Sequence, residues 1–289
     1  MISPRGSFLL PLPNRPALVL GDRTLVMGVL NVTPDSFSDG GEAFDPDRAV
    51  DRALAMEADG ADLIDVGAES TRPGAEPVDA AEEWRRLGPV LTGLVRRLGV
   101  PISIDTYRAR TAQRALDEGV AIVNDISGLG YDAGLGAIVA ARGAALILMH
   151  TRGRPRDMYV EACYDDVVAE VVRELQLSME RAIGHGVTRD RLVIDPGFGF
   201  AKRADHSMTA LAHFASFAAL GRPLLSGPSR KSFLTSATGP LPPQDRDWAT
   251  AAAITASVLA GAHIVRVHRV REMAQVVRVA DALRQAGAP

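Results

Sequence analysis

The sequence predicts an α/β protein, a (β/α)8 TIM barrel with an N-terminal hairpin extension. First, short apolar runs of β-forming residues alternate with longer helical patterns throughout the 289-residue chain. Second, eight such units can be counted, and eight parallel strands with their helices close into a barrel of about 250 residues. Third, the first expected strand runs into Asn31-Val32-Thr33-Pro34, whereas an open doubly wound sheet usually has a glycine-rich, dinucleotide-binding turn at this point.

The expected strands are short and almost wholly apolar, which is typical of strands buried on both faces. In chain order they are Leu25–Asn31, Leu63–Gly67, Ile102–Asp105, Ile122–Asp125, Ala145–His150, Leu192–Asp195, Pro223–Ser226 and Ile264–His268. The helices expected after them, in the same order, are Pro46–Asp59, Ala80–Leu98, Ala109–Glu118, Gly134–Ala141, Asp165–Gly184, Ser207–Ala219, Trp248–Ala260 and Ala274–Gln285. Regular alternation of this kind indicates parallel strands joined by helical crossovers.

We expect a single domain over residues 1–289, with an N-terminal extension and hairpin over 1–24 and the barrel over 25–289. Within the extension, Ala17–Leu20 is expected to pair, across a turn at Gly21-Asp22, with the chain from Leu25 onward. Such a hairpin can plug the bottom of a barrel. An open doubly wound sheet is the competing architecture.

The composition excludes several classes of protein. The 35 acidic and 32 basic side chains give a net charge of -3, so no nucleic-acid partner is expected. One cysteine, Cys163, cannot form an intrachain disulfide, and its isolation is compatible with the reducing cytoplasm. Met1–Pro16 is interrupted by prolines and lacks the apolar stretch of a signal peptide, and no run reaches the roughly 20 apolar residues of a membrane span.

Polar side chains stand where the expected strands end. They are Asn31, Asp65, Glu69, Ser70, Thr71, Arg72, Asp105, Asn124, Asp125, His150, Asp195, Ser229, Arg230, Lys231, Arg266 and His268. In a barrel of parallel strands all of these ends point to one face, which is the face that carries active sites. The sequence therefore predicts a polar site at this end of the barrel.

The acidic and amide members of this set can read a flat heterocycle that carries several N–H donors. Asp105, Asn124 and Asp195 would line such a crevice, and a buried carboxylate is selective because it must be hydrogen-bonded. Asp105 and Asp125 could instead cap the helices that follow them, and for Asp125 capping is the preferred interpretation.

The basic members can hold anions. Arg72, Lys231 and Arg266, with His268, suit phosphate oxygens. Asn31 offers a neutral oxygen ligand of the kind that Mg²⁺ accepts while it keeps most of its waters. A zinc hydrolase would have a His-x-His sequence at the first strand end, where Asn31 stands, so zinc is not expected.

Two loops, over residues 32–41 and 69–74, are rich in glycine, proline and small polar residues. Such loops can be lids that complete a site when they close, or simply exposed connections. The glycines of the run Gly197-Phe198-Gly199-Phe200 are expected to let the backbone approach a ligand.

With these residues in place, the chain resembles the dihydropteroate synthase family from about Leu25 to Ala282. The motifs that carry the resemblance are LNVTPDSFSDGG in the first loop, ESTRPG in the second, SID at Asp105, VNDISG at Asn124, LMHTRG at His150, DPGFGF at Asp195, SRKSFL at Lys231 and RVH at Arg266. Each motif alone is weak, but together they are highly specific.

The resemblance implies a transferase of folate biosynthesis. Such an enzyme joins 4-aminobenzoate to (7,8-dihydropterin-6-yl)methyl diphosphate and releases diphosphate and 7,8-dihydropteroate. The family also implies Mg²⁺ as cofactor and a homodimer formed through barrel helices. Because the diphosphate leaves a methylene cation conjugated with the pterin, we expect an SN1-like displacement, in which a neutral arylamine is a sufficient nucleophile and no catalytic triad is needed.

The family's functional residues map onto this sequence in three sets. The implied pterin contacts are Asp105, Asn124, Asp195 and Lys231, with Met149 packed near the ring. The implied diphosphate contacts are Asn31, Arg266 and His268, and Asn31 is also the implied Mg²⁺ contact. The implied aminobenzoate and loop residues are Thr71, Arg72, Phe200 and Ser229, while Asp35 faces the reacting carbon. Of these, the catalytic group is Asp35, Lys231, Arg266 and His268.

The sequence departs from the family pattern at two positions. Arg269 stands where an acidic residue usually follows the RVH motif, and Ala201 stands where a glycine often precedes Lys202.

Two other functions stay open. A related pterin-binding barrel that transfers a methyl group from methyltetrahydrofolate to a corrinoid would share the pterin contacts, but it would need neither the SRK motif nor the first loop. A non-catalytic paralogue that binds a pterin or a partner should show damaged loops or a lost anion anchor, and the sequence shows neither.

Overall fold

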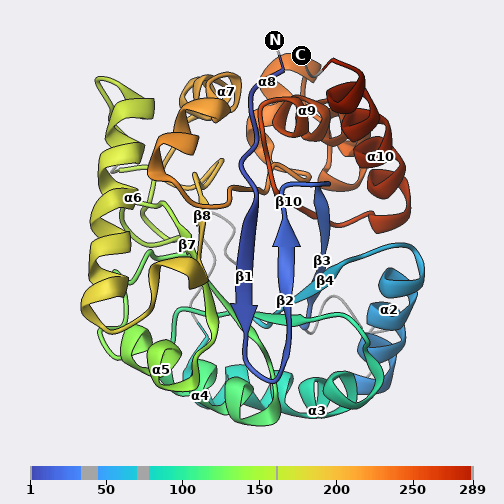
Figure 1. Cartoon of the computed structure of the whole chain (residues 1–289), viewed down its shortest axis with the longest axis vertical. Helices are drawn as coiled ribbons and strands as arrows, with labels where there is room; N and C mark the ends of the chain where they lie inside the picture. Colours follow the sequence, from blue (N-terminus) through green and yellow to red (C-terminus); the bar gives the residue numbers. More distant parts are fainter. Residues whose placement is uncertain (1, 34–44, 70–77, 161, 288–289) are drawn as a thin grey trace.

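The computed structural model describes residues 2–33, 45–69, 78–160 and 162–287. Eight parallel strands form a barrel with helices around it, which confirms the predicted fold class (Figure 1). The strands are β3 (Leu25–Asn31), β4 (Leu63–Gly67), β5 (Ile102–Asp105), β6 (Ile122–Asp125), β7 (Ala145–Met149), β8 (Leu192–Asp195), β9 (Leu225–Ser226) and β10 (Ile264–Val267). Their order is β8-β7-β6-β5-β4-β3-β10-β9, and a parallel bridge between Ile194 and Leu224 closes the ring.

The helices that follow the strands cover the outside of the barrel (Figure 1). They are α2 (Pro46–Ala58), α3 (Ala80–Arg97), α4 (Ala109–Glu118), α5 (Leu135–Arg142), α6 (Val167–Gly184), α7 (Ala204–Ala212), α8 (Thr235–Thr238), α9 (Asp247–Leu259) and α10 (Val270–Ala286). The carboxylates of Asp79 and Asp166 accept hydrogen bonds from the first-turn N–H groups of α3 and α6, so these helices begin where a capping side chain is available.

The predicted helix over Ser207–Ala219 is wrong as a single element. The chain forms α7 up to Ala212 and then a 3-10 helix over Phe214–Leu220. Phe214, Phe217 and Leu220 are buried three residues apart, and that spacing places them on one face of a helix with three residues per turn.

The N-terminal hairpin exists, but it is formed by other residues than predicted. Strands β1 (Phe8–Leu12) and β2 (Arg15–Leu20) pair across a turn in which Asn14 has a φ of 54°, and the chain from Leu25 belongs to the barrel. The prolines concealed the first strand, because proline is disfavoured within sheets except at edges and irregularities. Pro11 lies where the strand register shifts between Leu10 and Leu12.

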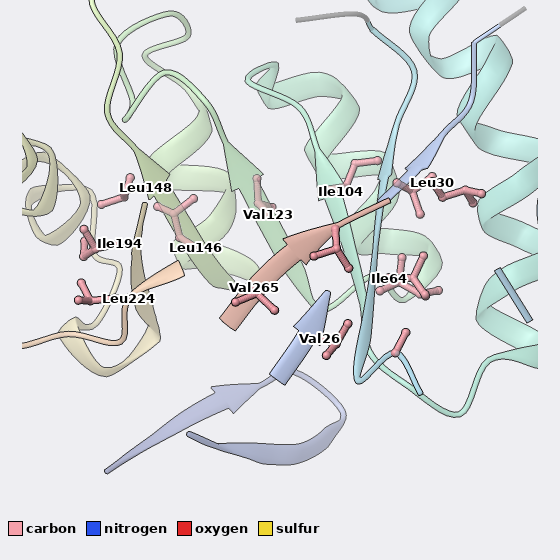
Figure 2. Close-up of a cluster of buried hydrophobic side chains, with 14 of the residues drawn as sticks. Val26, Leu30, Ile64, Ile104, Val123, Leu146, Leu148, Ile194, Leu224 and Val265 are labelled. Atoms are coloured by element: carbon pink, nitrogen blue, oxygen red, sulfur yellow. The ribbon is translucent and has the colours of Figure 1, made fainter. Parts of the chain in front are cut away.

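Side chains that point outward from the strands pack beneath the helices (Figure 2). They include Val26, Leu30, Ile64, Ile104, Val123, Leu146, Leu148, Ile194, Leu224 and Val265. Because side chains alternate along a strand, the residues between them point into the barrel.

The inward-pointing residues form two layers. The lower interior is apolar and packs on Leu10, Leu12 and Leu20 of the hairpin, which therefore plugs this end as predicted. Its barrel members are Leu25, Met27, Leu63, Ala121, Ile122, Ala145, Ile147, Val193, Leu225 and Ile264. Two residues further along four of these strands, on the same face, stand Asp65, Asn124, Asp195 and Arg266, which we call, with Asp105, the upper interior.

No helix in the described parts of the chain is both long and apolar enough to cross a membrane.

Candidate active site

Strand register brings the predicted residues to one level at the carboxyl ends of the strands. Asn31 lies opposite Gly67, Gly67 opposite Asp105, and Asp105 opposite Asn124. A Cβ atom at Gly67 would lie 3.2 Å from the Cβ of Asp105, so a glycine here leaves room for the carboxylate. The prediction that these strand ends gather at one face is therefore confirmed for this part of the barrel.

Arg266 lies at the centre of the upper interior. Its Nε donates to Asp65 Oδ2 at 2.6 Å and its Nη2 donates to Asp105 Oδ2 at 2.7 Å. Asn124 Nδ2 also donates to Asp65 Oδ2, at 2.9 Å. One guanidinium thus links β10, β4 and β5, and the pull of the two carboxylates raises its pKa despite desolvation.

The carboxyl group of Asp105 is largely buried, and it shares the Arg266 cation with Asp65. Burial raises the pKa of Asp105 to about 7, while Arg266 opposes the rise and Asp65 adds to it. The Oδ1 atom of Asp65 is buried and has no hydrogen-bond partner among the described residues. Two carboxylates facing one arginine therefore leave unfilled acceptors, and a ligand with N–H donors can satisfy such acceptors.

A second group of polar atoms lies at the end of β8. Asp195 Oδ1 accepts a hydrogen bond from the Gly197 N–H at 2.8 Å. Lys231 Nζ donates to the Phe198 carbonyl at 2.6 Å and lies 3.9 Å from the centroid of the Phe200 ring. Burial lowers the pKa of Lys231 to about 7, and attraction to Asp195 opposes that shift. This lysine therefore lies between a carboxylate and an aromatic face.

The loop after β9 is anchored to α9 through Arg230. Arg230 has a φ of 59° and forms a bidentate ion pair with Asp247, with N–O distances of 2.7 and 2.8 Å. Its backbone N–H donates to Thr250 Oγ1 at 3.0 Å. The anchoring of Arg230 to α9 fixes the residues on either side of it, Ser229 and Lys231.

His268 contributes to the site as a neutral ring. Its Nδ1 lies 2.9 Å from Ser229 Oγ, which also accepts the His268 backbone N–H at 3.3 Å. The serine hydroxyl proton is then directed at Nδ1, which leaves Nε2 as the donor. Burial and the neighbouring Arg266 lower the pKa of His268 to about 3, so this residue offers an N–H rather than a charge to an anion.

The apolar residues predicted at the site also come together. Met149 and Phe200 are buried in one cluster above the strand ends. Its other members are Tyr107, Ile126, Met158 and Ala201, with Tyr131 packed against them. This cluster gives the polar residues an apolar wall.

Asp125 is buried in a structural role, but it does not cap the helix as predicted. Its carboxylate accepts hydrogen bonds from the N–H groups of Ser127 and Leu129 at 2.8 and 2.6 Å, and so it organises the turn after β6. The N-terminus of α5 has no side-chain cap. Arg269, the departure from the family pattern, is exposed and forms an ion pair with Glu272 at the start of α10.

Three predicted residues, Asp35, Thr71 and Arg72, lie outside the described residues. Among those described, Asn31 is an exposed residue at the end of β3. The described chain holds no group of three or more histidine, cysteine or acidic side chains arranged for a metal ion.

Sequence reasoning gave no specific role to two residues of the site. Asp65 is fully buried within a strand that is otherwise apolar, and a carboxylate in the middle of such a strand was the available signal. Lys202 is also almost fully buried, beside the turn that follows β8. Its position after a glycine- and phenylalanine-rich run gave no comparable sign, because lysine in a loop is usually exposed.

A model of the pterin binding enzyme family matches residues 27–268. Fold and site together thus define a barrel enzyme of the pterin-binding class. A dihydropteroate synthase of Synechocystis sp. is 45% identical over 263 residues, which are 91% of this chain and 91% of that protein. The chain belongs to the dihydropteroate synthase family.

Solved structures agree with this assignment. Xanthomonas albilineans dihydropteroate synthase with 4-aminobenzoic acid is 40% identical, has a TM-score of 0.87, and the match covers 94% of this chain and 96% of that one. The enzyme of the same organism in complex with 7,8-dihydropteroate is 35% identical with a TM-score of 0.85, covering 96% of this chain and 100% of that one.

Proposed function

We propose that the chain condenses (7,8-dihydropterin-6-yl)methyl diphosphate with 4-aminobenzoate to give 7,8-dihydropteroate and diphosphate. The observation that carries the proposal is the upper interior, where Arg266 lies between Asp65 and Asp105 beside Asn124. The relatives in complex with 4-aminobenzoic acid and with 7,8-dihydropteroate support the same reaction.

The pterin ring binds within the upper interior in this proposal. Asp105 and Asp195 accept hydrogen bonds from ring N–H groups, Asn124 and Lys231 add further polar contacts, and Met149 packs near the ring. Burial supports such roles, since a desolvated carboxylate is unfavourable until a donor meets it. A heterocycle without these N–H groups would leave the acceptors unpaired and be rejected.

The diphosphate binds toward Arg266 and His268. The guanidinium supplies positive charge and the His268 ring supplies an N–H, so the two residues stabilise the charge that develops on the leaving oxygen.

Mg²⁺ fits beside them at Asn31, because one neutral protein oxygen plus substrate phosphates and waters is a common set for this ion. The ion, when bound, neutralises part of the diphosphate charge.

The aminobenzoate binds on the other side of Lys231. Ser229 and Phe200 form part of its pocket, together with Thr71 and Arg72 of the second loop. Asp35 faces the methylene carbon, where positive charge develops as the diphosphate leaves in an SN1-like step. Lys231 lies over Phe200, so it borders both the pterin and the aminobenzoate.

A homodimer in the cytoplasm completes the proposal. The late helices carry exposed apolar side chains, of which Trp248 on α9 and Val279 and Leu283 on α10 are examples. Apolar side chains gathered on one part of a surface are typical of protein interfaces. Sedimentation of the purified chain measures its oligomeric state directly, and a monomer at micromolar concentration contradicts this part of the proposal.

The function is tested by following diphosphate release from the pterin diphosphate with Mg²⁺, with and without 4-aminobenzoate, and by identifying the pterin product by mass. Aminobenzoate-dependent release with dihydropteroate formed is expected. Pterin binding without condensation would instead favour a non-catalytic paralogue, and corrinoid-dependent methyl transfer would favour the methyltransferase.

The SN1-like step is tested by positional isotope exchange within the diphosphate of the bound substrate. Exchange in the absence of aminobenzoate is expected, because the carbon–oxygen bond breaks before the amine attacks.

A further inference from the structure

The turn that follows β8, residues 196–201, has an unusual backbone. Gly197, Gly199 and Ala201 have φ values of 71°, 74° and 47°, so three alternate residues lie in the left-handed region. This turn carries Phe200, and its Gly197 N–H holds the carboxylate of Asp195. A backbone of this kind persists only where its surroundings constrain it.

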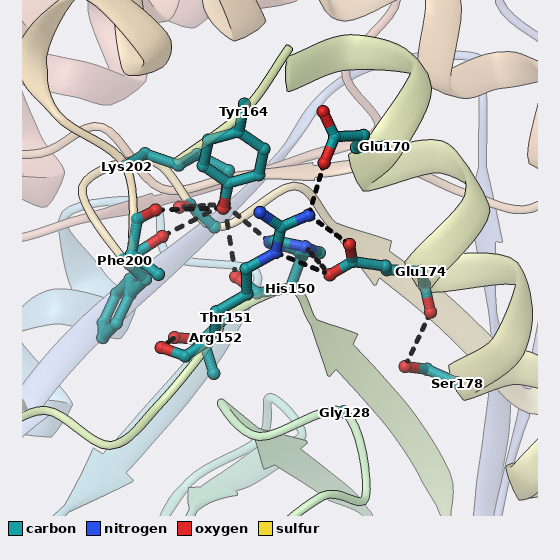
Figure 3. A network of polar contacts seen from close by, with 12 residues as sticks. Gly128, His150, Thr151, Arg152, Tyr164, Glu170, Glu174, Ser178, Phe200 and Lys202 are labelled. Carbon is teal, nitrogen blue, oxygen red and sulfur yellow. Dashed lines mark hydrogen bonds and ion pairs between the residues drawn. The ribbon is translucent and has the colours of Figure 1, made fainter. Parts of the chain in front are cut away.

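Lys202 supplies much of that constraint from beneath the site. Its Nζ is buried and lies 3.1 Å from the carbonyl oxygens of both Gly197 and Phe200. It also lies 2.7 Å from Nδ1 of His150, at the end of β7 (Figure 3). The ammonium group therefore ties both ends of the turn to the neighbouring strand.

The state of His150 follows from its partners. Its Nε2 lies 2.9 Å from Glu174 Oε2, and Arg152 forms an ion pair with the same carboxylate. His150 and Arg152 lower the pKa of Glu174 to about 2, and burial lowers the pKa of His150 to about 4. At neutral pH the ring is uncharged and Nε2 must carry the proton, because it faces a carboxylate.

Nδ1 of His150 is then an acceptor, so Lys202 Nζ faces three acceptors within 3.1 Å, and the His150 carbonyl is a fourth at 3.5 Å. Three donors are what a protonated lysine has. Burial lowers the pKa of Lys202 well below its usual value, and attraction to Asp195 and Glu174 opposes only part of that shift. The two turn carbonyls can only accept, so the contacts themselves require N–H groups on Nζ. The contacts from Glu174 through His150 to Lys202 therefore fix the direction of each hydrogen bond. The remaining N–H groups of Lys202 Nζ donate to the carbonyls of Gly197 and Phe200.

A second donor holds the same turn. The Tyr164 hydroxyl donates to the Ala201 carbonyl at 2.9 Å, and the Arg152 guanidinium stacks 4.0 Å from the Tyr164 ring. Arg152 also pairs with Glu170 on α6 at 2.7 Å (Figure 3). The turn is thus connected through side chains to α6.

We propose that Lys202 is a positioning residue for pterin binding, which acts by fixing the Gly197 and Phe200 carbonyls and so the direction of the Asp195 carboxylate. His150 and Glu174 support it by keeping Nδ1 of His150 as an acceptor. The inference rests on the proposed function, in which Asp195 contacts the pterin. Lys202 itself lies beneath the turn and touches no substrate in this proposal.

The test compares two ligands that use different parts of the site. The probes are 6-hydroxymethylpterin, which has the ring without the diphosphate, and inorganic diphosphate with Mg²⁺, each titrated by calorimetry. For Lys202→Met we expect the pterin Kd to rise by about tenfold or more, because small displacements of a binding group have effects of this size, while the diphosphate Kd changes by less than about twofold. A merely structural role would reduce the folded fraction, and with it the number of sites, for both ligands alike.

Two further variants complete the test. Lys202→Gln replaces the amine by an amide whose NH2 group can donate two hydrogen bonds, so its pterin Kd should lie between those of the wild type and Lys202→Met. Arg203→Met removes the neighbouring exposed cation and is the matched control, with both Kd values expected unchanged. If Lys202→Met fails to fold by circular dichroism, Lys202→Gln carries the comparison.

The outcomes separate the inference from the function. Wild-type pterin affinity in a folded Lys202 variant, or an equal loss of both ligands, overturns the positioning role. A wild-type protein that binds no pterin contradicts the proposed function instead.

Discussion

The two halves of the barrel interior are made by the same strands and yet have opposite chemistry. In the lower interior, residues such as Leu63, Val193 and Ile264 pack on the hairpin. Two positions further along, on the same faces, come Asp65, Asp195 and Arg266. Since strand geometry is shared, only the side chains differ, so one half of the interior stabilises the fold and the other half is available for the proposed binding of substrate.

The difference has a physical cost. Burying apolar groups is favourable by itself, whereas buried charges are tolerated only when they are paired and hydrogen-bonded. Asp65 keeps an unpartnered oxygen, and Asp105 shares Arg266 with it. The upper interior is therefore the less stable half in the free protein, and we expect ligand binding to stabilise it.

The largest effect is expected from Arg266→Met. This change leaves Asp65 and Asp105 facing each other without a cation, and breaking a buried ion pair from one side costs about 3–5 kcal/mol. Loss of the anion contact should also lower kcat/KM by roughly 1000-fold or more. Chemical denaturation and steady-state kinetics measure the two effects, with Arg271→Met, an exposed change on α10, as control. Near wild-type turnover in Arg266→Met would show that the anion binds elsewhere.

Lys231→Ala should separate binding from stability. The side chain contacts the Phe198 carbonyl and the Phe200 ring and borders both proposed substrates. We expect kcat/KM to fall by about 100–1000-fold, as when one donor to a developing charge is removed. The fold should remain, as checked by circular dichroism and thermal unfolding. Wild-type rates in the folded variant would remove Lys231 from the site.

Leu20→Ala, in the lower interior, should reduce stability without affecting substrate binding. Leu20 is fully buried between the hairpin and the barrel, so its truncation should cost about 2–5 kcal/mol of unfolding free energy. Because the hairpin packs at the other end of the barrel from the site, KM for both substrates should be unchanged in the folded variant. A selective change in pterin affinity would show that the two layers are coupled.

The pH dependence of the unfolding free energy should come from the titratable groups in and beside the upper interior. The pKa of Asp105 is raised from 3.8 to about 7, so the native state binds the extra proton and stability falls as the pH rises through this window. The pKa of Lys231 is lowered from 10.5 to about 7, so the unfolded state binds the extra proton and stability rises above pH 7.

These opposite slopes predict a stability minimum near neutral pH in the ligand-free protein. Asp105→Asn should abolish the loss of stability that the wild type shows as the pH rises toward 7. Leu20→Ala should lower the stability by the same amount at every pH and leave the shape of the curve unchanged. Denaturation midpoints measured from pH 5 to about pH 9 provide the check. A curve for Asp105→Asn parallel to that of the wild type would assign the titration to other groups.

The contrast between the lower and the upper interior also explains which features could be predicted from the sequence. The alternation of short apolar runs with longer helical patterns was sufficient for the barrel, and the bounds of β3 to β6 and β8 were predicted as observed. The residues of the candidate site could be proposed from the sequence because polar groups at strand ends converge in a parallel barrel. Asp65 and Lys202 were given no role because their importance depends on which side chains lie across from them, and the first hairpin strand was missed because Pro11 and Pro13 conceal it.

The smallest effect is expected at Ala201, one of the two departures from the family pattern. Its φ of 47° lies in the left-handed region, where an alanine is strained and a glycine is not. Ala201 is also fully buried, in the turn after β8 that Lys202 and Tyr164 hold through hydrogen bonds. Ala201→Gly should therefore raise the unfolding free energy by about 1 kcal/mol, reduced by the greater freedom that glycine gives the unfolded chain. Thermal unfolding of both proteins measures the difference, and a lower midpoint for Ala201→Gly would mean that the loss of the methyl packing outweighs the relief of strain.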